Sequence, residues 1–149
     1  MKYLFNEGSV ELPDSSENRT LHMLILDPAT SLSCSMIISQ FMTGESPAQF
    51  VDRQMKTLSK QLAKFKETKR ESIKIANAAE PDKPLSALLL ETQFKQGDQS
   101  FYQRQCVALL GDDKQALILT VNSHHPFSPH EISIWEKAYN TISLQRVVP

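Results

Sequence analysis

Histidine and cysteine are the residues of this chain best suited to metal binding or nucleophilic catalysis. Three of the four histidines, His124, His125 and His130, lie close together in the sequence. Zinc sites on a helix normally use histidines four residues apart, or histidines combined with cysteines at short spacing. Adjacent histidines project in different directions, and neither cysteine is near them in the sequence. The pattern therefore favours ordinary surface histidines, and we expect no metal site.

The two cysteines, Cys34 and Cys106, would be candidate nucleophiles if a histidine lay beside either of them. Each has apolar neighbours, in Met36-Ile37-Ile38 and in Val107-Ala108-Leu109-Leu110. Such surroundings favour an inert, packed thiol over a reactive thiolate, and two free thiols over a disulfide. The chain also has no glycine-rich phosphate loop and no G-x-S-x-G motif. We therefore expect no catalysis and no cofactor.

Composition predicts one soluble domain over residues 1–149. The net charge is −1, so no basic surface for nucleic acid is indicated, although Phe101, Tyr102 and Arg104 could be interpreted as a base-stacking strand. No apolar run approaches the ~18 residues of a membrane span. The first residues, M-K-Y-L-F-N-E-G, lack the apolar core of a secretory signal. We expect a soluble, intracellular protein without stable membrane association.

Two capping boxes predict two helices. In the first, Ser46 is the N-cap, a proline follows, and Gln49 completes the box; in the second, Ser128 and Glu131 have these roles. The first helix is expected to continue to Phe65, because apolar residues recur at spacings of four and three. This stripe consists of Val51, Met55, Leu58, Leu62 and Phe65.

The remaining apolar segments alternate as strands do. Gly97 suits a tight hairpin turn, and Asp27-Pro28 suits a turn between two strands early in the chain. The predicted strands are Tyr3–Phe5, Ser9–Leu12, two within Asn18–Phe41, Lys69–Ala76, Leu85–Lys95, Phe101–Leu110 and Gln115–Asn122. The order of elements predicts an α+β fold, a largely antiparallel sheet flanked by two main helices.

The two strands within Asn18–Phe41 have apolar residues on both faces. On the first, Leu21, Met23 and Ile25 share one face, and Leu24 and Leu26 share the other. On the second, Cys34, Met36 and Ile38 share one face, and Ile37 and Phe41 share the other. A small antiparallel sheet usually has one wet face. Either each face is covered by a helix, or part of one face binds a partner such as a second copy, a peptide or an apolar ligand.

Short motifs along nearly the whole chain resemble those of Eag-type chaperones of bacterial type VI secretion systems, in the DcrB-like family. Near the start they are F-N-E-G-S-V-E-L-P-D, T-L-H-M-L and S-M-I-I-S. The first helix contributes F-V-D-R-Q-M and K-Q-L-A-K-F. The later part contributes F-Y-Q-R-Q-C-V and P-H-E-I-S-I-W-E-K-A.

This resemblance implies a fold akin to the nuclear-import factor Mog1 and the photosystem protein PsbP, in a bacterial homodimer without catalysis. It implies a cytoplasmic chaperone that shields the N-terminal transmembrane helices of a PAAR-domain effector and helps to load the effector onto the secretion spike. The implied effector-binding residues are Leu21, Met23, Leu62, Gln54 and Gln105, and we expect Met36 and Ile38 to extend the same surface. The alternative is a protein of the same fold that binds a small apolar molecule.

Overall fold

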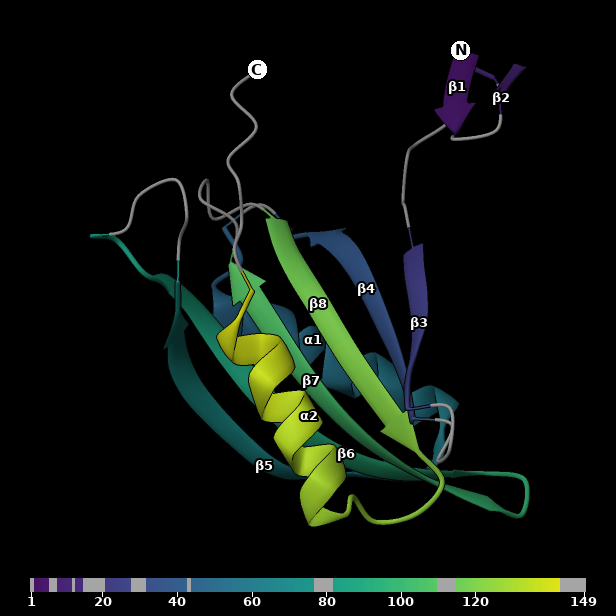
Figure 1. Ribbon diagram of the computed structural model, residues 1–149, viewed down its shortest axis with the longest axis vertical. Helices are drawn as coiled ribbons and strands as arrows, with labels where there is room; N and C mark the ends of the chain where they lie inside the picture. The colour runs from purple at the N-terminus through teal and green to yellow at the C-terminus, as the bar shows by residue number, and fades with distance from the viewer. Residues whose placement is uncertain are drawn as a thin grey trace.

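A computed structural model describes residues 2–5, 8–11, 13–14, 21–27, 32–42, 44–76, 82–109 and 115–142 of the chain. Within them lie eight strands and two helices (Figure 1). The elements are β1 (Lys2–Phe5), β2 (Gly8–Glu11), β3 (Leu21–Asp27), β4 (Leu32–Gln40), α1 (Pro47–Gln61), β5 (Ala63–Ile75), β6 (Leu85–Gln96), β7 (Gln99–Leu109), β8 (Gln115–Ser123) and α2 (Pro129–Asn140). The turn expected at Pro28 lies outside the described residues.

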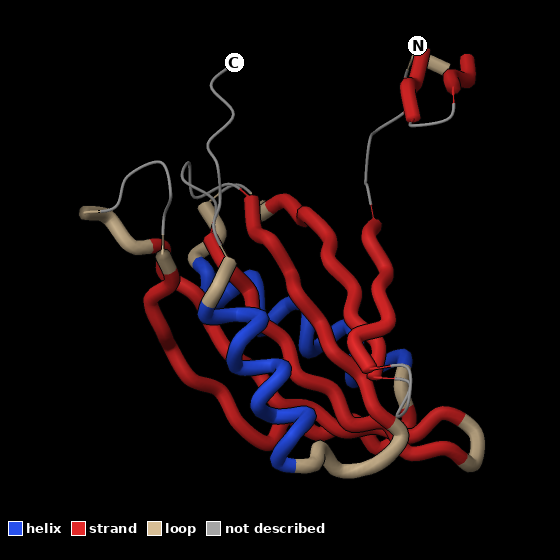
Figure 2. Tube along the Cα trace, viewed as in Figure 1, coloured by secondary structure: helices blue, strands red, loops and turns tan. Residues whose placement is uncertain are grey.

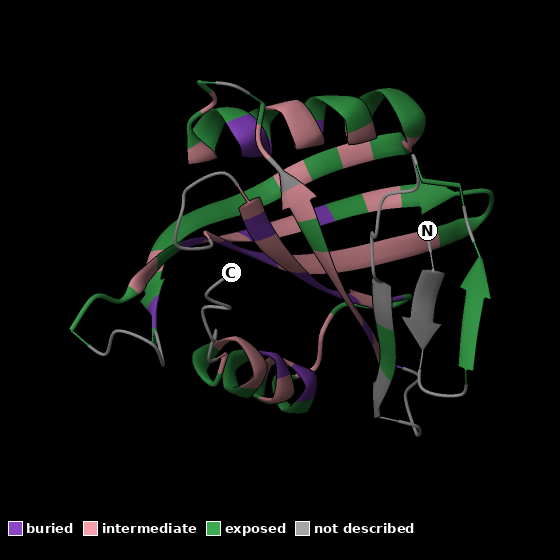
Figure 3. Cartoon of the chain, turned by 90° about the horizontal axis from the view of Figure 1, so that it is seen from above, coloured by how far each residue is buried: buried purple, intermediate pink, exposed green. Residues whose placement is uncertain are grey.

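Six strands form one antiparallel sheet in the order β3-β4-β8-β7-β6-β5, and β1 and β2 pair with each other in a second sheet (Figure 2). The two helices lie on opposite sides of the six-stranded sheet (Figure 3). The predicted α+β architecture is therefore confirmed. Gly97 has a φ of 62° at the tight turn between β6 and β7, where a side chain would be strained.

Both predicted capping boxes are present. Ser46 Oγ accepts a hydrogen bond from the Gln49 N–H at 3.2 Å, and Gln49 Oε1 accepts one from the Ser46 N–H at 2.9 Å. Ser128 and Glu131 make the same reciprocal pair at the start of α2. These bonds satisfy two backbone donors at each helix start, which fixes where the helices begin.

The predicted end of the first helix is wrong. α1 ends at Gln61, Leu62 is its C-cap, and Phe65 belongs to β5. The chain passes from helix to strand without a loop. At this change of direction Lys64 has a φ of 52°, and a register shift lies between Ala63 and Lys66. Phe65 nevertheless packs against the same cluster as the α1 residues, which is why the apolar spacing continued past the helix.

Each helix closes a separate core against the sheet. The core between the sheet and α1 contains Phe50, Val51, Met55, Leu90, Val107 and Ala116. The core between the sheet and α2 contains Cys34, Ile75, Ala87, Cys106, Ala108, Leu119, Val121 and Trp135. We call the two sides of the sheet the α1 face and the α2 face. Neighbouring residues such as Cys106 and Val107 belong to different cores because side chains alternate along a strand.

Candidate functional site

Helix α1 covers only part of its face of the sheet. The partly buried side chains around its core are Phe41, Leu58, Phe65, Leu88 and Ile118. With the buried core residues they come from α1, β5, β6, β7, β8 and the residue after β4. Among the side chains that the structure describes, none comes from β4 itself, and Met23 of β3 is 72% exposed. The α1 face therefore stays open towards the β3 side of the sheet.

The strand register arranges the α1 face in rows that cross the sheet from β3 to β6. One row is apolar and consists of Leu21, Ile37, Ile118, Val107 and Leu88. The next row is mixed and consists of Met23, Ser35, Thr120, Gln105 and Leu90. The third row consists of Ile25, Ser33, Asn122, Gln103 and Thr92. Polarity thus increases from the first row to the third, and none of the three rows contains a charged residue.

At the β3 end of the mixed row, Met23 is 72% exposed. A large apolar side chain with that exposure gains free energy when a partner covers it. The Ser35 hydroxyl beside it can bond a polar group of a partner without the cost of burying a charge. This open part of the α1 face is chemically suited to an apolar segment that brings some backbone or small polar groups.

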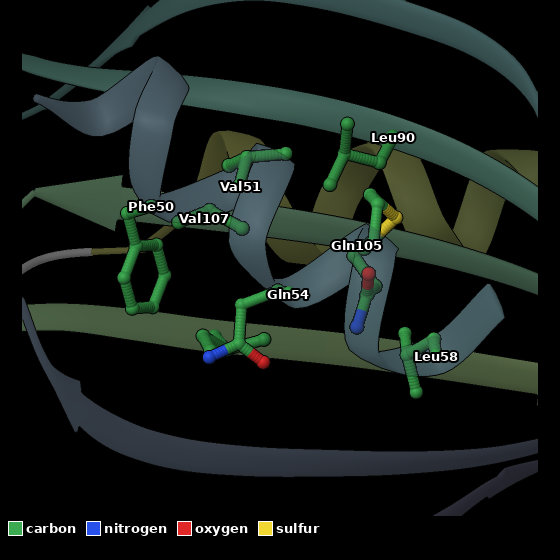
Figure 4. Close-up of a pocket in the computed structure, with 9 residues that line it drawn as sticks. Phe50, Val51, Gln54, Leu58, Leu90, Gln105 and Val107 are labelled. Atoms are coloured by element: carbon green, nitrogen blue, oxygen red, sulfur yellow. The ribbon is translucent and has the colours of Figure 1, made fainter. Parts of the chain in front are cut away.

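A small cavity lies where α1 meets the sheet and contains two of the predicted site residues. Gln54 of α1 and Gln105 of β7 line it together with apolar side chains (Figure 4). Its volume is about 20 Å³, and roughly 10–15 Å³ is enough for one water molecule. Gln105 Nε2 donates to Thr120 Oγ1 at 3.2 Å, whereas the buried Gln105 Oε1 has no hydrogen-bond partner. The site can therefore offer a buried acceptor beside an apolar wall.

The predicted site residues do not all lie on one surface. Met23 and Gln105 share a row, position 21 is in the adjacent row, and Leu62 is half-buried at the end of α1. The expectation that Met36 and Ile38 extend this surface is wrong. They pair with Leu119 and Leu117 of β8, on the α2 face, and Met36 packs against the core below α2.

A second hollow, near the turn between β6 and β7, contains residues that the sequence interpretation did not assign to a site. Its volume is about 290 Å³. It is lined by Ser33, Phe94, Phe101, Gln103, Asn122, Ser123 and His124. The hairpin around Gly97 pairs Phe94 with Phe101, so this part of the lining could have been inferred from the position of the turn.

The two edges of the six-stranded sheet differ in charge. At one edge, β5 carries five basic and two acidic residues, and Arg70 bonds Glu67 Oε1 at 2.6 Å and Asp52 Oδ1 of α1 at 2.8 Å. At the other edge, β3 has the sequence LHMLILD, in which Asp27 is the only acidic residue and none is a lysine or arginine. Charged edges resist pairing with other strands, and uncharged edges do not.

The contacts of His125 and the burial of Cys106 are typical of residues that stabilise a fold. His125 Nε2 lies 3.0 Å from Glu131 Oε1, and Glu131 is buried. Burial alone would raise the pKa of Glu131, but hydrogen bonds from the Ser128 backbone N–H and from His125 outweigh it and the pKa is lowered. Burial raises the pKa of the Cys106 thiol to about 12. In the part of the chain that the structure describes, no three His, Cys, Asp or Glu side chains converge as a metal site would require.

Comparison with known proteins gives consistent results across the chain. A family model described as DcrB matches residues 7–141. Effector EagT6 from Pseudomonas aeruginosa is 28% identical over 145 residues, which cover 94% of this chain and 93% of that protein. The crystal structure of PA94, a Pseudomonas aeruginosa protein of unknown function, has a TM-score of 0.61 at 24% identity and covers 99% of this chain and 98% of its own. No helix among the described residues is long and apolar enough to cross a membrane.

Proposed function

Because the chain belongs to the DcrB family, we propose that it is a chaperone and adaptor for a type VI secretion effector. Its cargo is the N-terminal transmembrane region of an effector with a PAAR domain, which it shields in the bacterial cytoplasm and helps to load onto the secretion spike. The similarity to Effector EagT6 supports the link to effectors. The motif resemblance of both helices and of β3, β4 and β7 supports the chaperone role.

The observation that supports this proposal best is the open, uncharged part of the α1 face beside exposed Met23. A membrane helix must keep its side chains away from water and has only backbone and small polar groups to bond. The rows of the α1 face offer apolar side chains next to amides and hydroxyls, with no charge to desolvate.

The energy available from such a contact is sufficient for shielding. Covering on the order of 1,000 Å² of apolar surface yields roughly 25 kcal/mol of gross transfer free energy at ~25 cal/mol per Å². Loss of translational and rotational freedom and side-chain ordering offset much of this. The remainder holds the segment in solution until a competing apolar surface, such as the target membrane, takes it over.

We further propose that the active form is a homodimer. The β3 edge supports this, because it contains no lysine or arginine and only one acidic residue, Asp27, and an edge strand with few charges is an available template for pairing with another chain. A dimer would present two open α1 faces to a cargo that contains more than one transmembrane helix.

Co-expression tests the proposal. A PAAR-domain effector from the same genome is truncated to its N-terminal apolar region, tagged, and expressed with and without this chain. We expect a soluble complex only when both are present, and static light scattering gives its stoichiometry. A region that stays in the insoluble fraction despite abundant soluble partner contradicts the proposal.

The 290 Å³ hollow favours a second candidate, a protein that binds a small apolar molecule. This volume is near the lower end of the ~300–1,000 Å³ typical of small-molecule sites. Native mass spectrometry that finds a bound lipid or metabolite, together with no binding of any effector segment, would favour this alternative.

A further inference from the structure

The hollow near the β6–β7 turn, which we call the hairpin pocket, has one aromatic wall. The Phe94 and Phe101 rings are nearly parallel, with 5.0 Å between their centroids and an interplanar angle of 6°. The His124 ring continues this row at 4.6 Å from Phe101 and is tilted by 59°. These three rings form an aromatic cluster against which another ring can stack or pack edge to face.

The other lining residues of the hairpin pocket are uncharged and can form hydrogen bonds. They are Ser33, Gln103, Asn122 and Ser123. Gln103 and Asn122 are adjacent in the third row of the α1 face and are partly exposed. No hydrogen bond joins either side-chain amide to another of the described residues. Each amide therefore has a free donor and a free acceptor for a ligand.

The size of the hairpin pocket suits one ring system. A buried apolar cavity of ~150 Å³ is enough for a benzene molecule. The hairpin pocket has about 290 Å³, which leaves room for a bicyclic ring such as indole. The absence of carboxylates, lysines and arginines from its lining argues against an ionic ligand.

The location of the hairpin pocket relates it to the proposed cargo. The rows of the α1 face change from apolar to polar towards the β6–β7 turn, and the pocket includes members of the polar row. Membrane helices change in the same way from an apolar middle to interfacial ends that are rich in tryptophan and tyrosine. These two side chains combine an apolar ring with one polar group, as the aromatic wall and the amides of the pocket require.

We propose that the hairpin pocket receives a tryptophan or tyrosine side chain from the interfacial end of the bound membrane helix. The ring packs on Phe101, and its N–H or O–H bonds Gln103 or Asn122. This contact fixes the register of the helix on the α1 face and determines which end lies at the β6–β7 turn. The inference rests on the proposed function, since it assigns a place to one residue of the cargo.

Two synthetic peptides test it. Both are labelled leucine–alanine helices of about 20 residues with flanking lysines. At one terminal position of the helix, one peptide has tryptophan and the other has leucine. We expect the tryptophan peptide to bind the wild-type chain about fivefold to tenfold more tightly by fluorescence anisotropy. Equal affinities overturn the pocket assignment and leave the chaperone proposal intact. If neither peptide binds, the chaperone proposal fails, and this inference fails with it.

Matched variants locate the effect. Gln103→Ala and Phe101→Leu should remove the preference for tryptophan. Gln93→Ala, an exposed amide on the α2 side of neighbouring β6, should keep it. Thermal melts by circular dichroism establish that each variant is folded. A tryptophan preference that survives in a folded Phe101→Leu variant contradicts the proposal.

Free indole tests whether the hairpin pocket binds an aromatic ring in the absence of a cargo helix. In a titration followed by amide NMR, the backbone signals of Gln103, Asn122 and His124 should shift in the wild type and shift less in Phe101→Leu. Absence of any shift at these positions at millimolar indole overturns the ring-binding assignment.

Discussion

Met23→Asp should abolish cargo binding, whereas Leu24→Asp on the same strand should not. Both residues are large and apolar, and both are exposed, Met23 by 72% and Leu24 by 50%. They differ in direction: Met23 pairs with Ser35 on the α1 face, and Leu24 pairs with Cys34, a member of the core below α2. The two variants therefore place an aspartate on opposite faces of the same strand, with the same introduced charge.

The size of the effect follows from burial and charge. Fully burying a methionine side chain is worth about 1.5–3 kcal/mol, so covering the exposed part of Met23 contributes about 1–2 kcal/mol. An aspartate at this position loses that contribution and adds several kcal/mol for placing a carboxylate against an apolar helix. The sum exceeds about 3 kcal/mol, which weakens binding more than about a hundredfold.

Calorimetric titration with the solubilised effector region, or co-purification if the affinity is too high to measure, gives the comparison. Both variants should keep the wild-type free energy of unfolding within about 0.5 kcal/mol, because both positions are exposed. Leu24→Asp should bind within about threefold of the wild type. Equal losses for the two variants, or normal binding by folded Met23→Asp, would refute the assignment of the open α1 face.

Three further predictions concern the scaffold. Lys64→Gly should raise the free energy of unfolding in urea by about 0.5–1 kcal/mol, because Lys64 has a left-handed φ that disfavours a side chain; Lys66→Gly, in the adjacent strand backbone, should lower it. The Cys106 thiol, with its pKa raised to about 12 by burial, should react with a thiol reagent at pH 8 only after unfolding, and rapid labelling of the native protein would contradict its inert packing. Glu131 has a lowered pKa when folded, so it stabilises the protein above its unfolded pKa of about 4.3 and loses that contribution as the pH falls; Glu131→Gln should therefore lose less stability than the wild type between pH 6 and pH 3 in thermal melts.

The starts of both helices could be predicted because capping is a local property. Ser46 with Gln49, and Ser128 with Glu131, satisfy backbone donors within four residues of chain. The end of α1 could not be predicted in the same way. Phe65 packs into the α1 core from a strand, and periodicity alone does not distinguish that position from one more helical turn.

The surface assignment failed for Met36 and Ile38 for a different reason. Alternation correctly placed these two residues on one side of β4 and Met23 on one side of β3. Which side of one strand matches which side of the next depends on their register, and a shift of one residue reverses every assignment. The pairing of Met23 with Ser35 puts Met36 on the opposite face.

The most direct test of the central claim is site-specific photocrosslinking from β4. A photoreactive amino acid is placed at Ser35, on the open α1 face, or at the adjacent Met36, on the α2 face, and the chain is co-expressed with the effector region. We predict a crosslink to the apolar N-terminal segment from position 35 and none from position 36. Crosslinking from position 36 alone, or from neither position in a stable complex, would contradict binding at the open α1 face.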